Sequence, residues 1–133
     1  MYKIVFALVS LALLSGCDSE FTSSIKKSEY SPYNRTIEDI FEKTEYCSSV
    51  EWDEIEYKGT KLLRGACLIN QENGVSDMTY LIYHFKRVND TVAIHNAYYG
   101  DKDKKVWGGG NRGKVSNREA HQFLRYLFID NIK

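Results

Sequence analysis

Residues 77–99 read DMTYLIYHFKRVNDTVAIHNAYY, and this stretch decides the fold of the chain. Tyrosine and isoleucine, which favour strands, recur in both halves, and Asn89-Asp90 between the halves is typical of a tight turn. The stretch therefore predicts two antiparallel strands, over 77–87 and 91–99. In the register of a two-residue turn, one face of this hairpin is more apolar, and we expect helices to cover it. That face would carry Leu81, Tyr83, Phe85, Val92 and Ile94.

The same register places His84 and His95 directly opposite one another, on the barer face of the hairpin. The Cβ atoms of such a pair lie about 5 Å apart, so the two imidazoles could hold a metal ion or form a pH-sensitive pair. A third ligand is not evident, because His121 belongs to a distant predicted helix. We therefore interpret the histidines as an ordinary cross-strand pair that faces outward, and we predict no metal site.

Two further strands are predicted upstream of this hairpin. Residues 61–70 (KLLRGACLIN) form one, and Glu72-Asn73-Gly74 after it is the best hairpin signal in the chain. Before it, the turn Lys58-Gly59-Thr60 follows a strand over 50–57, whose alternation changes phase and suggests a β-bulge near Asp53-Glu54. Four strands joined by tight turns predict an antiparallel meander. The first of them carries acidic residues typical of a protected edge strand, namely Glu51, Asp53, Glu54 and Glu56.

Helices are predicted on both sides of the four strands. Thr36 is a candidate N-cap for a short helix over about 37–46. Ser116 and Glu119 form a capping box, and an apolar stripe at helical spacing follows them. That stripe consists of Ala120, Phe123, Leu124, Leu127 and Phe128. The sequence therefore predicts one α+β domain over 34–133, with a short helix, a four-stranded antiparallel meander and a C-terminal amphipathic helix, both helices on one sheet face.

The N-terminus predicts an export signal. Met1-Tyr2-Lys3 carries one positive charge, and Ile4–Leu14 is an uncharged run of eleven residues. A helix of that length spans about 16 Å, roughly half of the hydrocarbon core of a membrane. The run is therefore too short for a transmembrane anchor and has the size of a secretory h-region.

Leu14-Ser15-Gly16-Cys17 resembles the lipobox of bacterial lipoproteins, and the resemblance covers about the first 17 residues. It implies a cleaved signal peptide over 1–16 and lipidation of Cys17 by a diacylglyceryl thioether and an N-acyl chain such as palmitate. Several acyl chains give stable anchoring, so the resemblance implies a protein held at a membrane on the periplasmic side. The alternative is a plain secretory signal, which would leave Cys17 as a free thiol. Asp18 resembles the signal that retains lipoproteins of enteric-type bacteria in the inner membrane.

Residues 18–32 are polar and rich in serine, without a periodic apolar face. We therefore expect residues 17–33 to comprise the lipidated cysteine and a flexible tether, with a typical reach of about 20 Å.

Cys47 and Cys67 are the two cysteines that remain after Cys17, an even number in an oxidising compartment. A disulfide between them would close a loop of about 20 residues and contribute roughly 3 kcal/mol to stability. Two buried thiols or a metal pair are the alternatives. However, the 19 intervening residues do not fit a C-x₂-C zinc spacing and contain no histidine.

The chain has 133 residues, 18 of them basic and 18 acidic, so its charge does not indicate nucleic-acid binding. Residues 100–115 (GDKDKKVWGGGNRGKV) stand out by composition. They match G-x-x-x-x-G-K, but Val115 follows where a phosphate-binding loop has Ser or Thr, and an antiparallel sheet lacks the βαβ context. We interpret this loop as a candidate patch for a protein partner, because Trp and Arg are favoured at interfaces; the alternative is that Trp107 fills the core under the loop. The candidate residues are Lys104, Lys105, Trp107 and Arg112.

Motifs for catalysis are missing from the sequence. It contains no G-x-S-x-G or H-E-x-x-H, and no cysteine is expected to be free to act with a histidine. We therefore predict that the protein is not an enzyme and has no cofactor. The leading hypothesis is an envelope lipoprotein whose domain binds another protein as an accessory, inhibitor or immunity factor. The alternative is a protein that binds or modifies cell-wall glycan through its many tyrosines.

Overall fold

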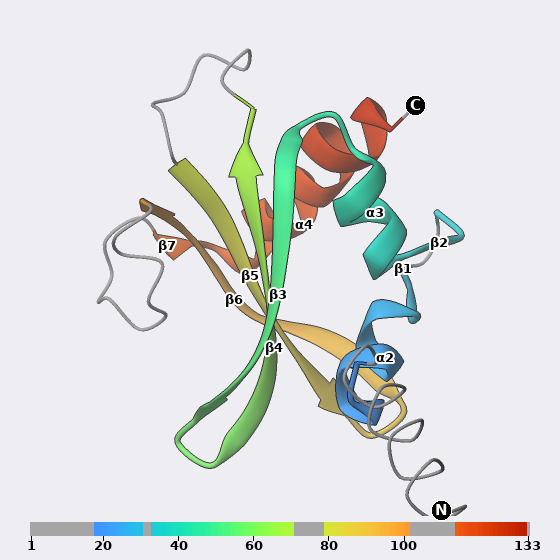
Figure 1. Cartoon of the computed structure of the whole chain (residues 1–133), viewed down its shortest axis with the longest axis vertical. Coiled ribbons are helices and arrows are strands. Elements are labelled where there is room, and N and C mark those ends of the chain that lie inside the picture. The colour runs from blue at the N-terminus through green and yellow to red at the C-terminus, as the bar shows by residue number, and fades with distance from the viewer. Residues whose placement is uncertain (1–17, 31–32, 71–78, 102–113, 133) are drawn as a thin grey trace, which may run out of the picture.

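A computed structural model describes residues 18–30, 33–70, 79–101 and 114–132 of the chain, as an α+β domain (Figure 1). Within these ranges it contains three α-helices, a two-stranded sheet and a five-stranded sheet, both antiparallel. The helices are α2 (Glu20–Lys26), α3 (Ile37–Lys43) and α4 (Asn117–Phe123), the last continued by a π-helical turn (Leu124–Phe128) and a 3₁₀ turn (Ile129–Asn131). The small sheet pairs β1 (Glu29–Tyr30) with β2 (Arg35–Thr36). The large sheet contains β3 (Cys47–Tyr57), β4 (Thr60–Ile69), β5 (Thr79–Val88), β6 (Thr91–Asp101) and β7 (Lys114–Val115).

The large sheet follows the chain in the order β3-β4-β5-β6-β7. The meander of four strands is therefore present, but the sheet has a fifth strand, because β7 pairs with β6 through Ala97 and Val115. Two residues are too few to show the alternation by which strands are predicted from sequence. The predicted acidic strand β3 lies at one edge of the sheet.

Two-residue turns connect β3 to β4 and β5 to β6 at the positions predicted from the sequence, although Thr60, predicted to lie in the first turn, already belongs to β4. Lys58 and Gly59 form the first turn, with φ angles of 50° and 80°. Asn89, with a φ of 57°, opens the second turn, whose flanking residues Val88 and Thr91 are paired. Turns with left-handed residues match the twist of the flanking strands.

The bulge predicted near Asp53-Glu54 is wrong. Pairing between β3 and β4 continues without interruption from Ser49 to Tyr57, and the register shifts between Cys47 and Ser49 instead. The phase of the apolar residues changes because this strand has apolar side chains on both faces. Trp52 packs against the main core, whereas Ile55 lies on the opposite face.

One face of the large sheet, which we call the inner face, packs against the helices and forms the main core. The predicted apolar face of the β5–β6 hairpin contributes to it, and only Val92 of that set is partly rather than fully buried. Phe41 of α3 contacts the rings of Trp52, Tyr83, Phe85 and Phe128 at centroid distances of 4.9–5.8 Å. All three helices lie to the right of the sheet in Figure 1, so the prediction that helices cover one face is confirmed.

The two predicted helices are confirmed with their caps. The Thr36 hydroxyl accepts a hydrogen bond from the Asp39 amide, and the Ser116 hydroxyl accepts one from the Glu119 amide. α3 ends at Lys43, three residues before the predicted end. The C-terminal stripe packs on the inner face, with Ala120, Leu124 and Phe128 fully buried.

The prediction of a flexible tether before residue 34 is wrong for the described residues. They contain α2, whose N-cap Ser19 accepts a hydrogen bond from the Thr22 amide. Ile25 of this helix has 0% exposure and belongs to the main core, and Phe21 packs against that core. Two apolar residues four apart are enough to fix a short helix on the sheet, but they are too few to give a periodic signal among serines.

Several sequence predictions lie outside the described residues. They are the signal peptide and the lipobox with Cys17, the hairpin signal at Glu72-Asn73-Gly74, and the loop patch of Lys104, Lys105, Trp107 and Arg112. None of the helices in the described part of the chain combines the length and the hydrophobicity needed to cross a membrane.

Candidate functional site

The disulfide between Cys47 and Cys67 is present and joins β3 to β4. The Cα atoms of the two residues are 5.3 Å apart, and Cys67 is fully buried on the inner face. The disulfide that was predicted from the number of cysteines is therefore confirmed. Its sulfur atoms are not available for metal binding or nucleophilic chemistry.

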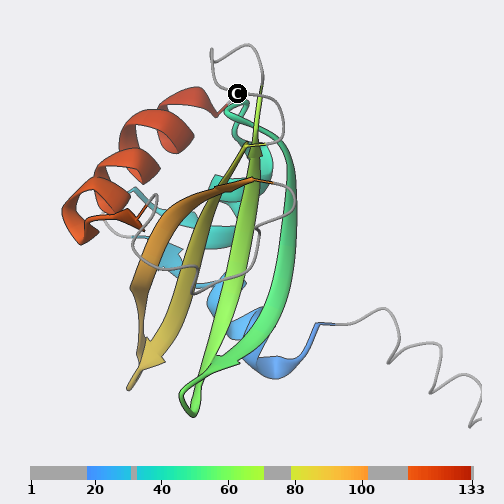
Figure 2. The same ribbon diagram turned by 90° about the vertical axis from the view of Figure 1, so that its left-hand side faces the viewer.

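The face of the large sheet opposite the helices, which we call the outer face, is the candidate binding surface. Among the described elements, no helix packs on it, and Figure 2 looks onto this face with α3 behind the strands. Its centre is a second cluster of buried residues, separate from the main core. The cluster consists of Ala66, Tyr80, Ile82 and Tyr98, with Leu68 packed against it.

A row of four polar residues crosses the outer face, one from each of β3 to β6. Asp53 lies opposite Arg64, Arg64 opposite His84, and His84 opposite Asn96. We call these four residues the polar row. At its β3 end, Arg64 Nη2 donates a hydrogen bond to Asp53 Oδ2 at 3.0 Å.

The predicted pairing of His84 with His95 is wrong. The register set by the turn holds from Val88 to Phe85 and then shifts by one residue, so that His84 pairs with Asn96. His95 is the extra residue of this bulge, and its ring lies 6.3 Å from that of Tyr57. A bulge depends on how a whole strand packs, and the turn that sets the register carries no information about it.

His84 is also buried, contrary to the prediction that it faces outward, with 0% exposure. The Tyr98 ring packs edge-on against it at a centroid distance of 5.3 Å. Burial lowers the pKa of the His84 imidazole to about 4; the adjacent Asn96 side chain opposes this shift, and the charges of Arg64 and His95 add to it. His84 is therefore neutral at pH 7.

The pKa of Tyr98 is shifted in the opposite direction to that of His84. Burial raises the pKa of its phenol to about 12, although the neighbouring Arg64 guanidinium acts in the opposite direction. The Tyr98 side chain therefore stays protonated and neutral beside His84 at any physiological pH.

Buried polar atoms without a hydrogen-bond partner gather in and beside the polar row. Within the described part of the chain, they include both ring nitrogens of His84, Asn96 Oδ1 and the Tyr98 hydroxyl. Such atoms are rare in folded proteins and each costs about 1–3 kcal/mol. Their concentration on one face distinguishes that face from the main core.

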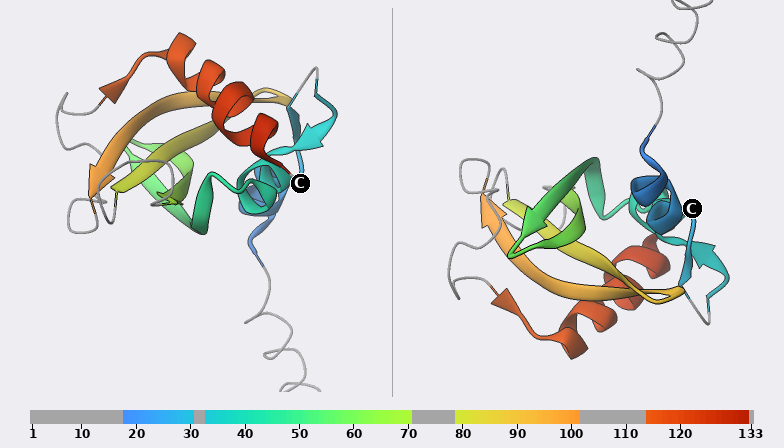
Figure 3. Two further views of the ribbon diagram at one scale, coloured as in Figure 1. Left: turned by 90° about the horizontal axis from the view of Figure 1, so that it is seen from above. Right: turned by 90° about the horizontal axis from the view of Figure 1, so that it is seen from below.

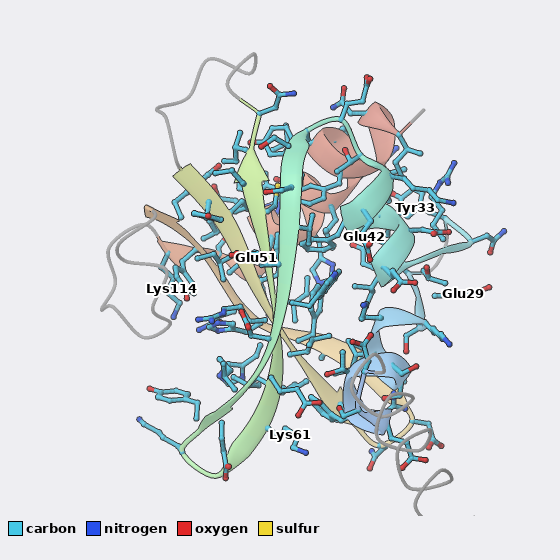
Figure 4. The ribbon with its side chains drawn as sticks, viewed as in Figure 1. Glu29, Tyr33, Glu42, Glu51, Lys61 and Lys114 are labelled. Carbon is cyan, nitrogen blue, oxygen red and sulfur yellow. A yellow bond between two sulfur atoms is a disulfide. The ribbon has the colours of Figure 1, made fainter. Side chains whose placement is uncertain are left out.

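The rim of the outer face carries opposite charges on its two sides. Glu51 and Asp53 are exposed on β3, and Lys114 is exposed on β7 at the other edge. Figure 4 shows Glu51 and Lys114 on the left of the sheet, whereas Glu42 and Tyr33 lie on the side of the helices.

Burial lowers the pKa of His95, and the nearby ammonium groups of Lys86 and Lys114 lower it further.

Partly exposed apolar side chains lie beside the acidic residues, on β3 and on the adjacent β4. Ile55 and Tyr57 contribute from β3, and Leu68 contributes from β4. A surface with apolar residues inside a charged rim can bind a protein by burying the apolar groups and pairing the charges. Among the described residues, no group of three His, Cys, Asp or Glu side chains could hold a metal ion.

The alignment of the polar row and the place of Tyr98 beside it were not predicted from the sequence. These residues are separated by 11 to 20 positions along the chain, and only the strand register brings them together. The predicted loop patch leaves the sheet between β6 and β7, and Lys114 at its end pairs with Tyr98. The described end of that loop therefore lies at the margin of the outer face.

Comparison with known proteins gives no relative for this chain. No family model matches it, and neither the curated proteins nor the solved structures contain a significant match.

Proposed function

We propose that this protein is a lipoprotein of the bacterial cell envelope, anchored to a membrane through Cys17 on the periplasmic side, and that its domain binds another protein. The observation that carries the binding role is the β3 edge of the outer face, where the partly exposed Ile55 and Tyr57 share one strand face with the exposed carboxylates of Glu51 and Asp53. An accessory, inhibitor or immunity-type role would use such a face.

The compartment is supported by two independent features. Leu14-Ser15-Gly16-Cys17 resembles a lipobox, and the disulfide between Cys47 and Cys67 is typical of proteins outside the cytosol. Asp18 after the lipidated cysteine favours retention in the inner membrane. The protein partner is then another component of the envelope or a protein that enters it.

Charge on the two edges of the outer face indicates how a partner would be oriented. The acidic side chains of β3 would attract a basic surface, and Lys114 on β7 would attract an acidic one. We expect a partner with a matching pair of charged patches about the width of the sheet apart, roughly 15–20 Å for four strand spacings.

Site-specific photo-crosslinking in cells tests the proposal. A photoreactive amino acid replaces Glu51 on the outer face or Glu42 on α3, both of them exposed glutamates on opposite sides of the sheet. We expect a discrete protein adduct from position 51 and none from position 42. Equal adducts from both positions would overturn the outer face as the binding surface. Binding of purified cell-wall glycan without a protein adduct would overturn the proposal in favour of the glycan-binding alternative.

A further inference from the structure

We infer that the end of the domain formed by α2 and the two hairpin turns of the large sheet lies directly on the lipid surface. This inference rests on the proposed anchoring of Cys17. It differs from the simple tethered lipoprotein because the folded domain begins one residue after the anchor, at Asp18. The partner assigned to this end is the headgroup layer of the membrane that holds the anchor.

Asp18 is tied to the domain by a charged pair. Its Oδ2 atom lies 2.9 Å from Lys26 Nζ, and the same ammonium lies 3.1 Å from Glu38 Oε2 in α3. Lys26 Nζ also lies 5.4 Å from the centroid of the Trp52 ring. The ammonium is mostly buried among these groups, so the residue next to the anchor is fixed relative to the sheet.

α2 is held to the strands by further contacts along its length. The hydroxyls of Ser19 and Thr22 both donate to Glu54 Oε1 of β3, the Thr22 bond at 2.6 Å. Arg87 Nη1 of β5 lies 3.3 Å from Ser24 Oγ, and Ile25 is fully buried in the main core. These contacts leave no free length of chain between residue 18 and the body of the domain.

The contacts also define which end of the domain adjoins the anchor. Glu54 lies four residues before the Lys58-Gly59 turn, and Arg87 lies two residues before the Asn89-Asp90 turn. Figure 1 shows α2 in the lower half with both hairpins, and Figure 3 (right) looks onto this end. The opposite end carries residues 127–131, which contact Thr44 and Glu45 just before β3 begins.

The composition of this end suits a membrane interface. Val88, at the end of β5, is 43% exposed. Lys27, just after α2, and Lys58 and Lys61, on the β3–β4 hairpin, are exposed at this end, together with the carboxylates of Glu20, Glu56 and Asp90. Lysines reach headgroups while their stems remain on apolar surface, and an apolar side chain between them contacts the acyl boundary.

Direct docking limits how far the protein reaches. β3 has 11 residues, so the sheet extends about 36 Å from the membrane if the strands run away from it. Without a tether, the outer face stands beside the membrane within that height. A partner of this face would therefore bind within about 36 Å of the membrane.

Energy transfer from the full-length lipidated protein to a headgroup-labelled lipid tests the inference. A fluorophore is attached through Val88→Cys or, as a matched control, through Tyr126→Cys, which replaces a 54% exposed residue in the π-helical turn. The native cysteines do not compete, because Cys47 and Cys67 are joined and Cys17 is acylated in the proposal. The vesicles contain phosphatidylethanolamine and phosphatidylglycerol.

We expect transfer at least twofold more efficient from position 88 than from position 126. A Gly-Ser insertion of 15 residues between Cys17 and Asp18 should bring the two efficiencies together, because it restores a tether. Equal transfer from both positions without the insertion, in protein that floats with the vesicles, would overturn docking and leave the anchor intact. Failure of the protein to float with the vesicles would overturn the anchor itself and docking with it.

Discussion

His84 and Gly65 illustrate how single residues depend on their cross-strand neighbours. His84 stays neutral because burial lowers its pKa, and the charge of the neighbouring Arg64 adds to this shift. Gly65 lies opposite Trp52 on the inner face, where a Cβ atom would come within 2.8 Å of Trp52 Cζ3. In both cases the residue type is explained by the strand opposite.

Acid should destabilise the domain through His84. The pKa of His84 is about 4 in the folded state because of burial and about 6.5 when unfolded, so the unfolded state binds a proton at higher pH. Stability contributed by the neutral ring is fully present above pH 6.5 and is lost as the pH falls towards 4. The free energy of unfolding falls by about 3 kcal/mol once the pH is below the folded-state pKa.

Urea unfolding at pH 7 and pH 4.5 measures this effect. We expect His84→Phe to remove most of the difference between the two pH values, because a neutral ring remains in the same place. The control His95→Asn should retain most of it, since His95 is partly exposed. An unchanged pH dependence in His84→Phe would assign acid sensitivity to other groups.

Gly65→Ala should displace the Trp52 ring. The added Cβ would also lie 3.3 Å from Phe41 Cε2, so neither aromatic ring can remain in place. Overpacking of this kind costs about 1–3 kcal/mol. We expect a lower thermal midpoint and a shifted tryptophan emission, whereas Thr60→Ala at an exposed position of the same strand should change neither. Wild-type emission in Gly65→Ala would contradict the close packing of Trp52 on β4.

Elements of this fold differ in how they are held. All three helices have an N-cap, but α3 and the extended C-terminal helix each bury three apolar side chains, whereas α2 has one fully buried apolar side chain, Ile25, and a set of polar contacts to β3 and β5. Isolated helices of seven residues are not stable in water. α2 is therefore a product of tertiary contacts, and its stability should depend strongly on Ile25.

Ile25→Ala tests whether α2 is part of the domain. Truncation of a buried isoleucine costs about 2–5 kcal/mol, so we expect a clear loss in the free energy of unfolding measured with urea. Lys27→Ala, two positions along the chain at an exposed site, serves as the control and should have little effect. If both variants unfold like the wild type, residues 18–30 are a tether after all.

In the proposed lipoprotein, the cysteines have two separate functions. Cys17 precedes every described contact, whereas Cys47 and Cys67 are joined within the sheet. Attachment to the membrane and stability of the domain should therefore respond independently to substitution, and each variant provides the control for the other.

Cys17→Ser should release the protein from the membrane fraction without changing its thermal midpoint. The double variant Cys47→Ser, Cys67→Ser should remain in the membrane fraction and lose about 3 kcal/mol of stability, because the closed loop no longer restricts the unfolded chain. Cell fractionation and thermal unfolding of the purified proteins measure the two properties. Membrane retention of Cys17→Ser would contradict lipid anchoring.

Local signals in the sequence were sufficient for much of the fold. The caps at Thr36 and Ser116, the turns at Lys58-Gly59 and Asn89-Asp90, and alternation over 77–99 predicted two helices and the meander. Each signal depends on residues within a few positions of one another, so it can be recognised in the sequence without the tertiary structure. The disulfide followed from a cysteine count and the expected compartment.

Only the tertiary structure determined α2, the strand β7, the bulge at His95 and the polar row. α2 and β7 are too short to be stable or recognisable alone, and they exist because the sheet provides a surface and an edge for them. The bulge moves Asn96 opposite His84, and a shift of one residue changes every neighbour across the strands. The outer face is therefore a property of register, which is set by packing between distant segments and has no local signature.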